Sequence, residues 1–370
     1  MNVPFLDLKA SYLELKDELD AAFQRVMNSG WYILGNEVAA FEREWANYCG
    51  TEHCVGVGNG LEALHLSLLA MGVGPGDEVI VPANTYIATW LAVSFLGAKP
   101  VPVEPCEKTY NIDPQKIEAA ITKKTKVILP VHLYGQPADM DPIMDLAGRY
   151  GLMVLEDSAQ AHGAIYKGRY CGALGTASAW SFYPGKNLGA FGDAGAVTTN
   201  NAQIADKVRV LRNYGSRVKY VNELKGFNSR LDELHAALLR VKLTKLNEWN
   251  NRRKKIAEFY LKNLSDLPDV TLPFVPDWAD PVWHVFVIRV KERERLQKFL
   301  DEHGIKTLIH YPIPPHLQAA YMDDFKGVSF PITESIHREV ISLPMGPALT
   351  MQMAEFVVDT IRKYFKAHSS

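Results

Sequence analysis

A repeated order of segments between about Tyr48 and Asn200 constrains the fold more than any other feature of this sequence. An apolar, strand-like run is followed by a loop with Gly, Pro, Asn or Asp, and then by a segment with helical spacing. The predicted strands are Glu78–Pro82, Pro100–Val103, Lys126–His132, Leu152–Glu156, Ala179–Tyr183 and Ala194–Thr199. The predicted helices are Leu61–Met71, Thr85–Leu96, Pro114–Ile121 and Asp139–Tyr150. This alternation predicts an α/β domain with a mostly parallel sheet that helices cover.

The C-terminal part of the chain has a different pattern. Helical spacing of Leu, Val and Trp begins near Ser229 and continues toward Leu264, so one long helix is predicted to leave the first domain. The later predicted elements are a strand at Trp283–Val290 and helices at Glu292–His303 and Met351–Phe365. We therefore expect a large domain at residues 1–240, with the N-terminal segment included, and a smaller α+β domain at residues 241–370.

Charge and composition exclude some classes of function. The formal net charge of the 370 residues is -2, so no overall basic field attracts nucleic acid or anionic lipid. The chain has no signal-peptide pattern and no run of about 18 apolar residues, so we expect a cytoplasmic protein without a membrane segment. Its cysteines lack metal-site spacing and are predicted to be reduced thiols: Cys49, Cys54, Cys106 and Cys171. We expect neither a metal site nor a nucleic-acid partner.

A candidate phosphate site lies at Val57–Leu64, with the sequence Val-Gly-Asn-Gly-Leu-Glu-Ala-Leu. Small residues precede a predicted helix there, so backbone N–H groups near Gly60 and Leu61 are exposed at the positive end of the helix dipole. The spacing differs from the dinucleotide fingerprint GxGxxG. A glycine-rich turn can also serve packing alone, so this segment by itself leaves both interpretations open.

A second candidate is Asp157, at the acidic end of the apolar strand that ends in Leu155-Glu156-Asp157. Open α/β sheets bind ligands at the carboxyl ends of their strands. A carboxylate in that position can cap a helix, bind a metal, or pair with the protonated pyridine nitrogen of pyridoxal 5'-phosphate (PLP). The strand alone does not decide among these roles.

A third candidate is Lys186, in a glycine-rich loop with the sequence Ser181-Phe-Tyr-Pro-Gly-Lys-Asn-Leu-Gly. Most lysines lie on solvated surfaces, whereas the neighbours of this one are Pro, Gly, Asn and aromatic residues. Such surroundings disfavour the ammonium form and lower the pKa of the amine, which can then form a Schiff base. A Walker phosphate loop is excluded because Asn187 follows the Gly-Lys pair.

Taken in order, the three segments resemble the DegT/DnrJ/EryC1/StrS family of sugar aminotransferases, a branch of the fold-type I PLP enzymes. The resemblance extends along the chain and includes Gly30–Gly35, Pro82–Tyr86, Glu156–Asp157 and His310–Pro312. It implies a large α/β domain with a mostly parallel seven-stranded sheet and a smaller C-terminal domain. It also implies PLP as the cofactor, a homodimer with shared active sites, and transamination as the activity.

The resemblance assigns a role to individual residues. Lys186 is the catalytic residue, which holds the cofactor and moves the proton. The other implied cofactor contacts are Asp157 at the pyridine nitrogen, Gln160 at the phenolic oxygen, Tyr86 at the ring face, and Gly60, Leu61, Ser181 and Asn228 at the phosphate. Asn228 is implied to reach into the site of the neighbouring subunit. Many family members have Ser-Gly-Thr in the first loop, whereas this chain has Asn59-Gly60-Leu61 and so lacks one hydroxyl donor.

The same resemblance suggests the substrates. Asn59–Leu64 and Val131–Pro137 are similar to members that aminate carbon 3 of dTDP-linked 3-keto-6-deoxyhexoses, with L-glutamate as amino donor. Candidate substrate-binding residues are Tyr183, Arg230, His310 and Tyr311, each of which also has a plausible structural role. Three alternatives are weighed against this: amination of a 4-keto sugar, a non-catalytic PLP-binding regulator, and a sugar dehydrase. The dehydrase is disfavoured because those members carry histidine where this chain has Lys186.

Overall fold

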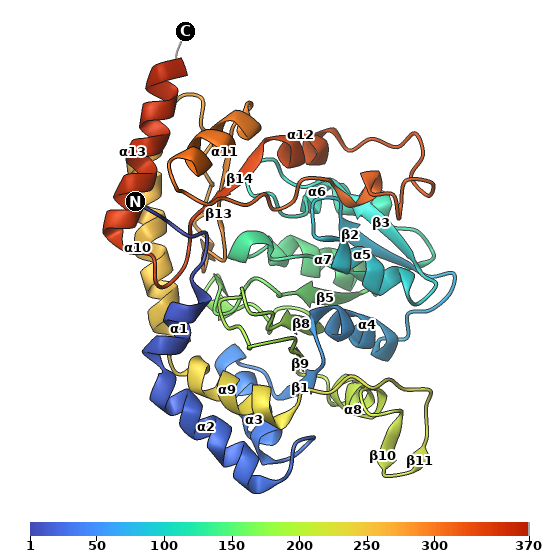
Figure 1. The fold of residues 1–370 in the computed structure, drawn as a ribbon. Coiled ribbons are helices and arrows are strands. Elements are labelled where there is room, and N and C mark those ends of the chain that lie inside the picture. The colour runs from blue at the N-terminus through green and yellow to red at the C-terminus, as the bar shows by residue number, and fades with distance from the viewer. Residues whose placement is uncertain (369–370) are drawn as a thin grey trace.

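The computed structural model describes residues 1–368 and is built around a seven-stranded sheet with the order β1-β9-β8-β5-β4-β2-β3 (Figure 1). Strands β2, β3, β4, β5 and β8 pair in parallel, whereas β9 is antiparallel to both β1 and β8. The strands are β1 His53–Val57, β2 Glu78–Pro82, β3 Lys99–Val103, β4 Thr125–Ile128, β5 Met153–Asp157, β8 Ala177–Ser181 and β9 Gly195–Thr199. This sheet confirms the α/β fold class expected from the sequence.

Helices cover both faces of the sheet because its strands are apolar on both sides. Val79 and Val81 of β2 pack into one core cluster with α4 and α5, whereas Ile80 between them packs into another with α7. The helices of this part are α1 Leu8–Glu14, α2 Lys16–Ser29, α3 Asn36–Cys49, α4 Gly60–Ala70, α5 Ile87–Ser94, α6 Pro114–Ile117, α7 Met140–Tyr150 and α8 Ala202–Leu211. Two-sided burial fixes the sheet in the middle of three layers.

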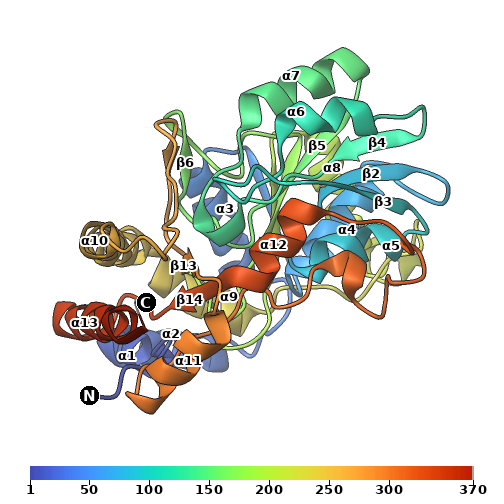
Figure 2. The same cartoon turned by 90° about the horizontal axis from the view of Figure 1, so that it is seen from above.

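The C-terminal region has its own core. Strands β13 (Phe286–Arg289) and β14 (Val340–Leu343) pair antiparallel. Helices α9 (Glu233–Leu243) and α10 (Leu246–Leu264) lead into this region, and α10 packs beside α13 (Met351–His368) (Figure 2). The remaining helices are α11 Arg293–Glu302 and α12 Pro331–Glu339.

The first residues of the chain lie against this C-terminal core. Val3 is fully buried in it and forms a parallel bridge with Ile305. The domain boundary between residues 240 and 241 stays a prediction. The contact of Val3 shows that the N-terminal end of the chain packs against the C-terminal core.

Short elements complete the chain. A hairpin of β10 and β11 projects beyond α8 (Figure 1). The short strands are β6 Ile165–Tyr166, β7 Arg169–Tyr170, β10 Ser216–Val218, β11 Val221–Asn222 and β12 Ala279–Asp280, and the 3-10 turns are η1 Glu118–Ala120, η2 Leu133–Gly135 and η3 Pro315–Leu317. Within residues 1–368 no helix is long and apolar enough to span a membrane.

Two expected elements differ from the structure. The long helix predicted from Ser229 to Leu264 is wrong, because α9 begins at Glu233 and the chain turns at Thr244 and Lys245 before α10. Both turn residues keep right-handed helical dihedral angles, so the apolar spacing continues through the turn and hides it. The strand predicted to reach His132 ends at Ile128, since Pro130 has no N–H to donate to a ladder.

Candidate active site

Loops at the carboxyl ends of the parallel strands bring the three sequence candidates to one edge of the sheet. Strand β5 ends at Asp157, and β8 ends at Ser181, five residues before Lys186 in the sequence. Helix α4 begins at Gly60, where an added Cβ atom would lie 2.5 Å from the Cβ atom of Ser181. Only a glycine permits this approach, which places the helix N-terminus beside the end of β8.

The N-terminus of α4 offers free backbone donors. The side chain of Asn59 caps the helix by accepting a hydrogen bond of 2.9 Å from the Glu62 N–H. The N–H groups of Gly60 and Leu61 open the helix and therefore have no acceptor within it. With the Ser181 hydroxyl beside them, these donors form a site suited to a phosphate group.

Asp157 is buried and has few partners. Thr89 donates to its Oδ2 atom at 2.9 Å, and the N–H of Ala159 donates to its Oδ1 atom at 3.2 Å. Burial raises the pKa of this carboxyl, while these hydrogen bonds and the positive charge of Lys186 oppose the shift. The carboxylate is thus held in place with capacity left to accept a further hydrogen bond.

The Lys186 amine lies close enough to Asp157 for their charges to interact. Its backbone N–H donates to the Tyr183 carbonyl at 2.8 Å, which closes the loop. Burial lowers the pKa of the amine to about 8, and the charge of Asp157 acts in the opposite direction. Among residues 1–368 no group forms a hydrogen bond or ion pair with this amine, so it is available for chemistry.

The loop that carries Lys186 is fixed from behind by two side chains. Asn187 is buried and its Nδ2 atom donates to Val282 O and to Asn250 Oδ1, both at 2.9 Å. Lys242 of α9 donates to the carbonyl of Gly189. The loop is therefore anchored to α9, α10 and the segment before β13.

Aromatic residues form another side of the site. Gln160 donates through Nε2 to the Tyr311 hydroxyl at 3.0 Å, and the Tyr86 ring lies 5.0 Å from the Tyr311 ring. Burial, and then the charge of Asp157, raise the pKa of Tyr311. His310 pairs through Nδ1 with Ser342 Oγ at 2.8 Å, and burial followed by the charge of Lys186 lowers its pKa to about 4. Tyr86, Gln160, His310 and Tyr311 are thus brought together near Asp157 and Lys186.

Three predicted residues stand apart in this single chain. Tyr183 is 58% exposed. Arg230 donates to Asn213 Oδ1 at 3.0 Å and lies 5.3 Å above the Tyr214 ring. Asn228 is exposed at the base of the β10–β11 hairpin, where it bridges Asn213. Apart from the backbone hydrogen bond between Lys186 and Tyr183, no described contact within residues 1–368 joins these three residues to Asp157 or Lys186, so their roles stay predictions.

Sequence reasoning missed other residues that the structure brings to this site. Thr89 binds Asp157, Asn187 anchors the lysine loop, and His284 lies against Asn187 at 3.3 Å. Asn187 is adjacent to Lys186 and could have been noticed, since a polar residue in an otherwise apolar loop needs a partner. Nothing local marks His284, which is distant in the sequence.

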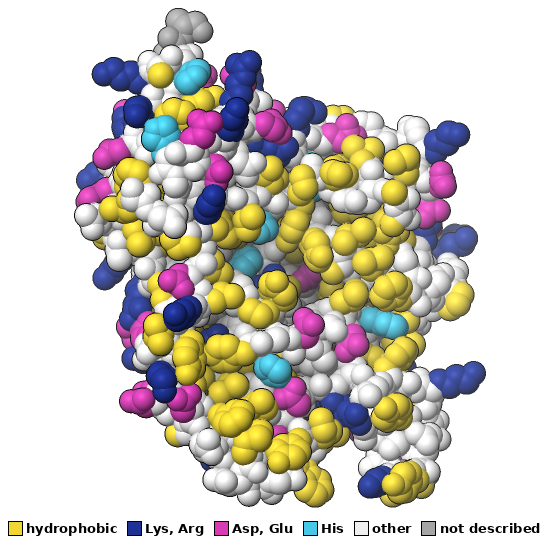
Figure 3. Space-filling view, in the orientation of Figure 1, with side chains coloured by type: hydrophobic (Ala, Val, Ile, Leu, Met, Phe, Trp, Pro, Cys, Tyr) yellow, Lys and Arg dark blue, Asp and Glu magenta, His cyan; other side chains and the backbone are white. Residues whose placement is uncertain are grey.

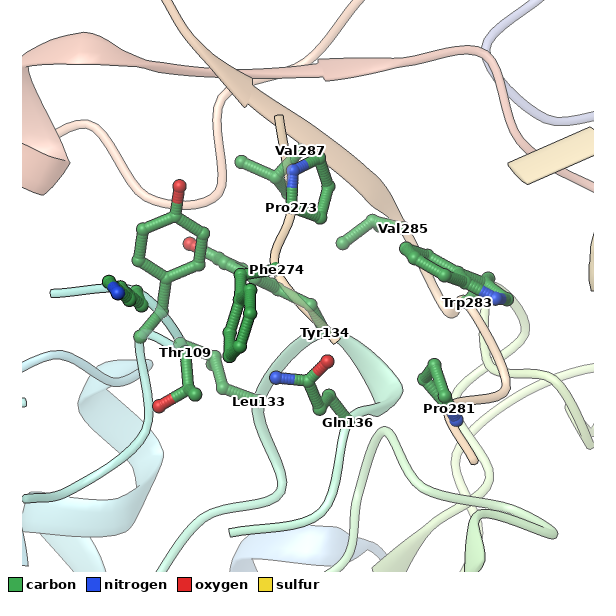
Figure 4. Close-up of a pocket in the computed structure, with 12 residues that line it drawn as sticks. Thr109, Leu133, Tyr134, Gln136, Pro273, Phe274, Pro281, Trp283, Val285 and Val287 are labelled. Carbon is green, nitrogen blue, oxygen red and sulfur yellow. The ribbon is translucent and has the colours of Figure 1, made fainter. Parts of the chain in front are cut away.

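The surface around these residues is largely apolar. Figure 3 shows hydrophobic side chains gathered around a hollow near the middle of the face seen in Figure 1. A separate pocket is lined in part by Leu133 and Tyr134 (Figure 4). Its lining includes Leu133, Phe274 and Trp283 and none of the predicted site residues. We interpret it as a packing gap beside the loop of Tyr134, whose backbone N–H donates to the Gln160 side chain.

One buried cluster has donor atoms that could hold a metal: His132, Glu156 and Cys171. Protein groups already engage the first two. Both ring nitrogens of His132 are paired, with Glu156 at 2.9 Å and with the Ala138 N–H at 3.0 Å. The Glu156 carboxylate also accepts three backbone N–H groups, from Gly172, Leu174 and Gly175. We interpret the cluster as a structural network of hydrogen bonds.

The site therefore combines a free lysine amine, a buried carboxylate and a helix N-terminus at one edge of an α/β sheet. These are the groups that a PLP enzyme needs for the aldehyde, the pyridine nitrogen and the phosphate of its cofactor. The residues present fit PLP on their own geometry and charge.

Comparisons with known proteins agree with this class. The profile of the DegT/DnrJ/EryC1/StrS aminotransferase family matches residues 13–362. The chain is 56% identical to a dTDP-3-amino-3,6-dideoxy-alpha-D-galactopyranose transaminase of Aneurinibacillus thermoaerophilus. The 362 aligned residues cover 98% of this chain and 99% of that protein. The protein belongs to the DegT/DnrJ/EryC1/StrS aminotransferase family.

Solved structures extend the similarity to three dimensions. The crystal structure of S. venezuelae DesV in complex with a ketimine intermediate matches with a TM-score of 0.96 at 54% identity, over 98% of each chain. NtdA from Bacillus subtilis with bound cofactor PMP matches with a TM-score of 0.93 at 33% identity, over 99% of this chain and 85% of that one. PLP is the cofactor of this family, as the sequence resemblance implied.

Proposed function

We propose that this protein transfers an amino group from L-glutamate to carbon 3 of a dTDP-linked 3-keto-6-deoxyhexose, which yields the 3-amino-3,6-dideoxy sugar. The observation that carries the reaction type is the Lys186 amine, which has a pKa of about 8, has no hydrogen-bond or ion-pair partner within residues 1–368, and lies beside the buried Asp157 carboxylate. The sugar is supported by the similar transaminase of A. thermoaerophilus.

Each residue at the sheet edge has a defined task in this reaction. Bound PLP supplies an electron sink for the carbon that carries the transferred nitrogen. Lys186 Nζ would hold the cofactor, and its free amine would accept and return the proton that moves during transfer. The Asp157 carboxylate would accept a hydrogen bond from the pyridine nitrogen. Gln160 would orient the phenolic oxygen, and the Tyr86 ring would lie against the cofactor face.

The phosphate is proposed to bind the N–H groups of Gly60 and Leu61 and the Ser181 hydroxyl, with Asn228 contributed by a second copy of the chain. The hairpin above Asn228 supports a homodimer with shared sites, because its tip exposes apolar side chains. Tyr220 is 87% exposed and Val218 is 63% exposed. Apolar residues this exposed on a projecting hairpin favour burial against a partner.

Substrate contacts are proposed for Tyr183, Arg230, His310 and Tyr311. Tyr311 and His310 are best supported, since both line the site beside Asp157 and Lys186. Arg230 is proposed to bind a carboxylate of L-glutamate, which its planar guanidinium suits. We place the enzyme in the cytoplasm because all four cysteines are unpaired, as expected in a reducing compartment.

The test is an absorbance spectrum of the purified protein during alternate addition of the two substrates. The band of bound PLP should bleach with L-glutamate and return with a dTDP-3-keto-6-deoxyhexose. Recovery only with a 4-keto sugar would move the site of amination. A PLP band that L-glutamate does not change would instead support a non-catalytic PLP-binding regulator.

A further inference from the structure

Two asparagine side chains behind Lys186 have orientations that their partners define. Asn250 Nδ2 donates to the carbonyl of His162 at 2.8 Å, so its Oδ1 atom faces Asn187. Asn187 Nδ2 in turn donates to the carbonyl of Val282 at 2.9 Å. Carbonyl oxygens only accept hydrogen bonds, so each carbonyl independently fixes which end of its amide is nitrogen.

The orientation of Asn187 determines the protonation of a histidine. With Nδ2 directed to Val282, the Oδ1 atom of Asn187 faces His284 Nδ1 at 3.3 Å. An amide oxygen can only accept, so Nδ1 of His284 must carry the hydrogen. In the neutral ring the other nitrogen, Nε2, is then an acceptor with a free lone pair.

The surroundings keep the His284 ring neutral. Burial lowers the pKa of His284 well below its ordinary value, and the charges of Lys186, Arg253, His310 and His162 lower it further. The Nε2 atom has no hydrogen-bond partner among the described residues and is not sealed from solvent. An acceptor of fixed tautomer, with some solvent contact, therefore lies beside Asn187, the residue that follows Lys186.

We infer that Asn187 locks His284 as a hydrogen-bond acceptor, and that His284 Nε2 binds an N–H or O–H donor in the active site beside Lys186. This inference rests on the proposed function for its setting. The donor has two possible sources with the same chemistry: the amine of Lys186 when it is free of the cofactor, or a hydroxyl of the keto-sugar. His284 positions the donor and need not exchange a proton with it.

The tautomer can be measured without any activity. Protein labelled with [15N]histidine should show the His284 ring in the neutral Nδ1–H form between pH 6 and 8, with its signal assigned by its loss in His284→Phe. Asn187→Asp should give a charged ring in the same pH range, since a carboxylate in that place stabilises the imidazolium. An Nε2–H tautomer, or a charged ring in the unmodified protein, would overturn the inference.

The donor is identified by following the two half-reactions separately. His284→Phe should slow the step that binds its donor by roughly tenfold, the effect of one lost hydrogen bond. Slowing of both half-reactions identifies the Lys186 amine, and slowing of the sugar half alone identifies a sugar hydroxyl. His284→Gln, which keeps an acceptor near the Nε2 position, should restore most of the rate.

Two controls separate this inference from the proposed function. His303→Phe removes a histidine of the α11 C-terminus, outside the site, and should leave both half-reactions unchanged. If His284→Phe retains the PLP band and both rates stay within about twofold of the unmodified protein, His284 binds no donor and the inference fails. If the unmodified protein itself does not bleach with L-glutamate, the proposed function fails, while the tautomer measurement still decides whether Asn187 locks His284.

Discussion

Lys186 lies in a loop that Lys242 of α9 contacts from outside, and burial lowers the pKa of both amines to about 8. The Lys242 amine donates to the Gly189 carbonyl and lies 4.8 Å above the Phe191 ring and 5.9 Å above the Trp249 ring. Lys186 has no such partner within residues 1–368. A lowered pKa therefore occurs in both a supporting and a reactive lysine, and the missing partner distinguishes them.

The two acidic residues that end β5 repeat this contrast. Glu156 accepts three backbone N–H groups and pairs with His132, which fills its hydrogen-bonding capacity from inside the protein. Asp157 accepts one N–H group and one hydroxyl and meets the charge of Lys186. We therefore assign Lys242 and Glu156 to the support of the site, and Lys186 and Asp157 to its chemistry.

Replacing Lys186 should have the largest effect on activity. We expect Lys186→Ala to lower the transamination rate by at least about 10⁴-fold, because the group that holds the cofactor is removed. The unfolding midpoint should change by only a few degrees, since this amine has no hydrogen-bond partner to lose among the described residues. Lys242→Met, the matched control, should retain turnover. Full activity in Lys186→Ala would contradict the assignment.

Glu156→Ala should mainly reduce stability. Three N–H groups, two of them buried, and His132 lose their acceptor, so we expect the free energy of unfolding to fall by about 3–5 kcal/mol. Urea unfolding of the two proteins side by side measures this difference. A fall of less than 1 kcal/mol in the free energy of unfolding would show that the hydrogen bonds of Glu156 do not give it the structural role that distinguishes it from Asp157.

Asp157→Asn should have the opposite profile. We expect the rate to fall by about 10²-fold, because a charge-assisted hydrogen bond to the cofactor is replaced by a neutral one. The free energy of unfolding should change little, since Asn keeps an oxygen for the Ala159 N–H and its Nδ2 atom can donate to the Thr89 hydroxyl, which can also accept. Steady-state kinetics with the urea curve of the same sample checks both parts, and a stable variant with full activity would remove Asp157 from the chemistry.

The smallest expected effect is a difference in labelling between the two lysines. In protein freed of PLP, acylation of Lys186 by acetic anhydride should rise with pH and level off above an apparent pKa of about 8. At pH 7 about a tenth of this amine is uncharged and reactive. Lys242, which is 6% exposed, should react only after unfolding. Peptide mass spectrometry distinguishes the two sites, and equal labelling would break the comparison.

Local patterns in the sequence predicted most of the large domain. The alternation of apolar runs and helical segments gave most of the parallel strands, and glycine-rich loops marked Gly60 and Lys186. The missed elements depend on distant partners. Strand β14 forms only by pairing with β13, more than 50 residues earlier. No pattern within Val340–Leu343 reveals that partner.

The same limit applies to the site. Glu156 and Asp157 are adjacent acids of equal appearance in the sequence, and only the backbone of residues 172–175 makes one of them structural. Asn187 and His284 are 97 residues apart, so their contact could not be anticipated from spacing. Reactive residues that lie within one loop can be predicted from the sequence. The residues that hold them in place come from several distant elements and cannot be predicted in this way.

The most direct test of the central claim is reduction of the PLP-loaded protein with borohydride, followed by peptide mass spectrometry. We expect one pyridoxyl group, on Lys186, and its disappearance when L-glutamate is added before the reductant. A pyridoxyl group on Lys242 or another lysine, or one that L-glutamate does not remove, would contradict the assignment of Lys186 as the residue that holds the cofactor.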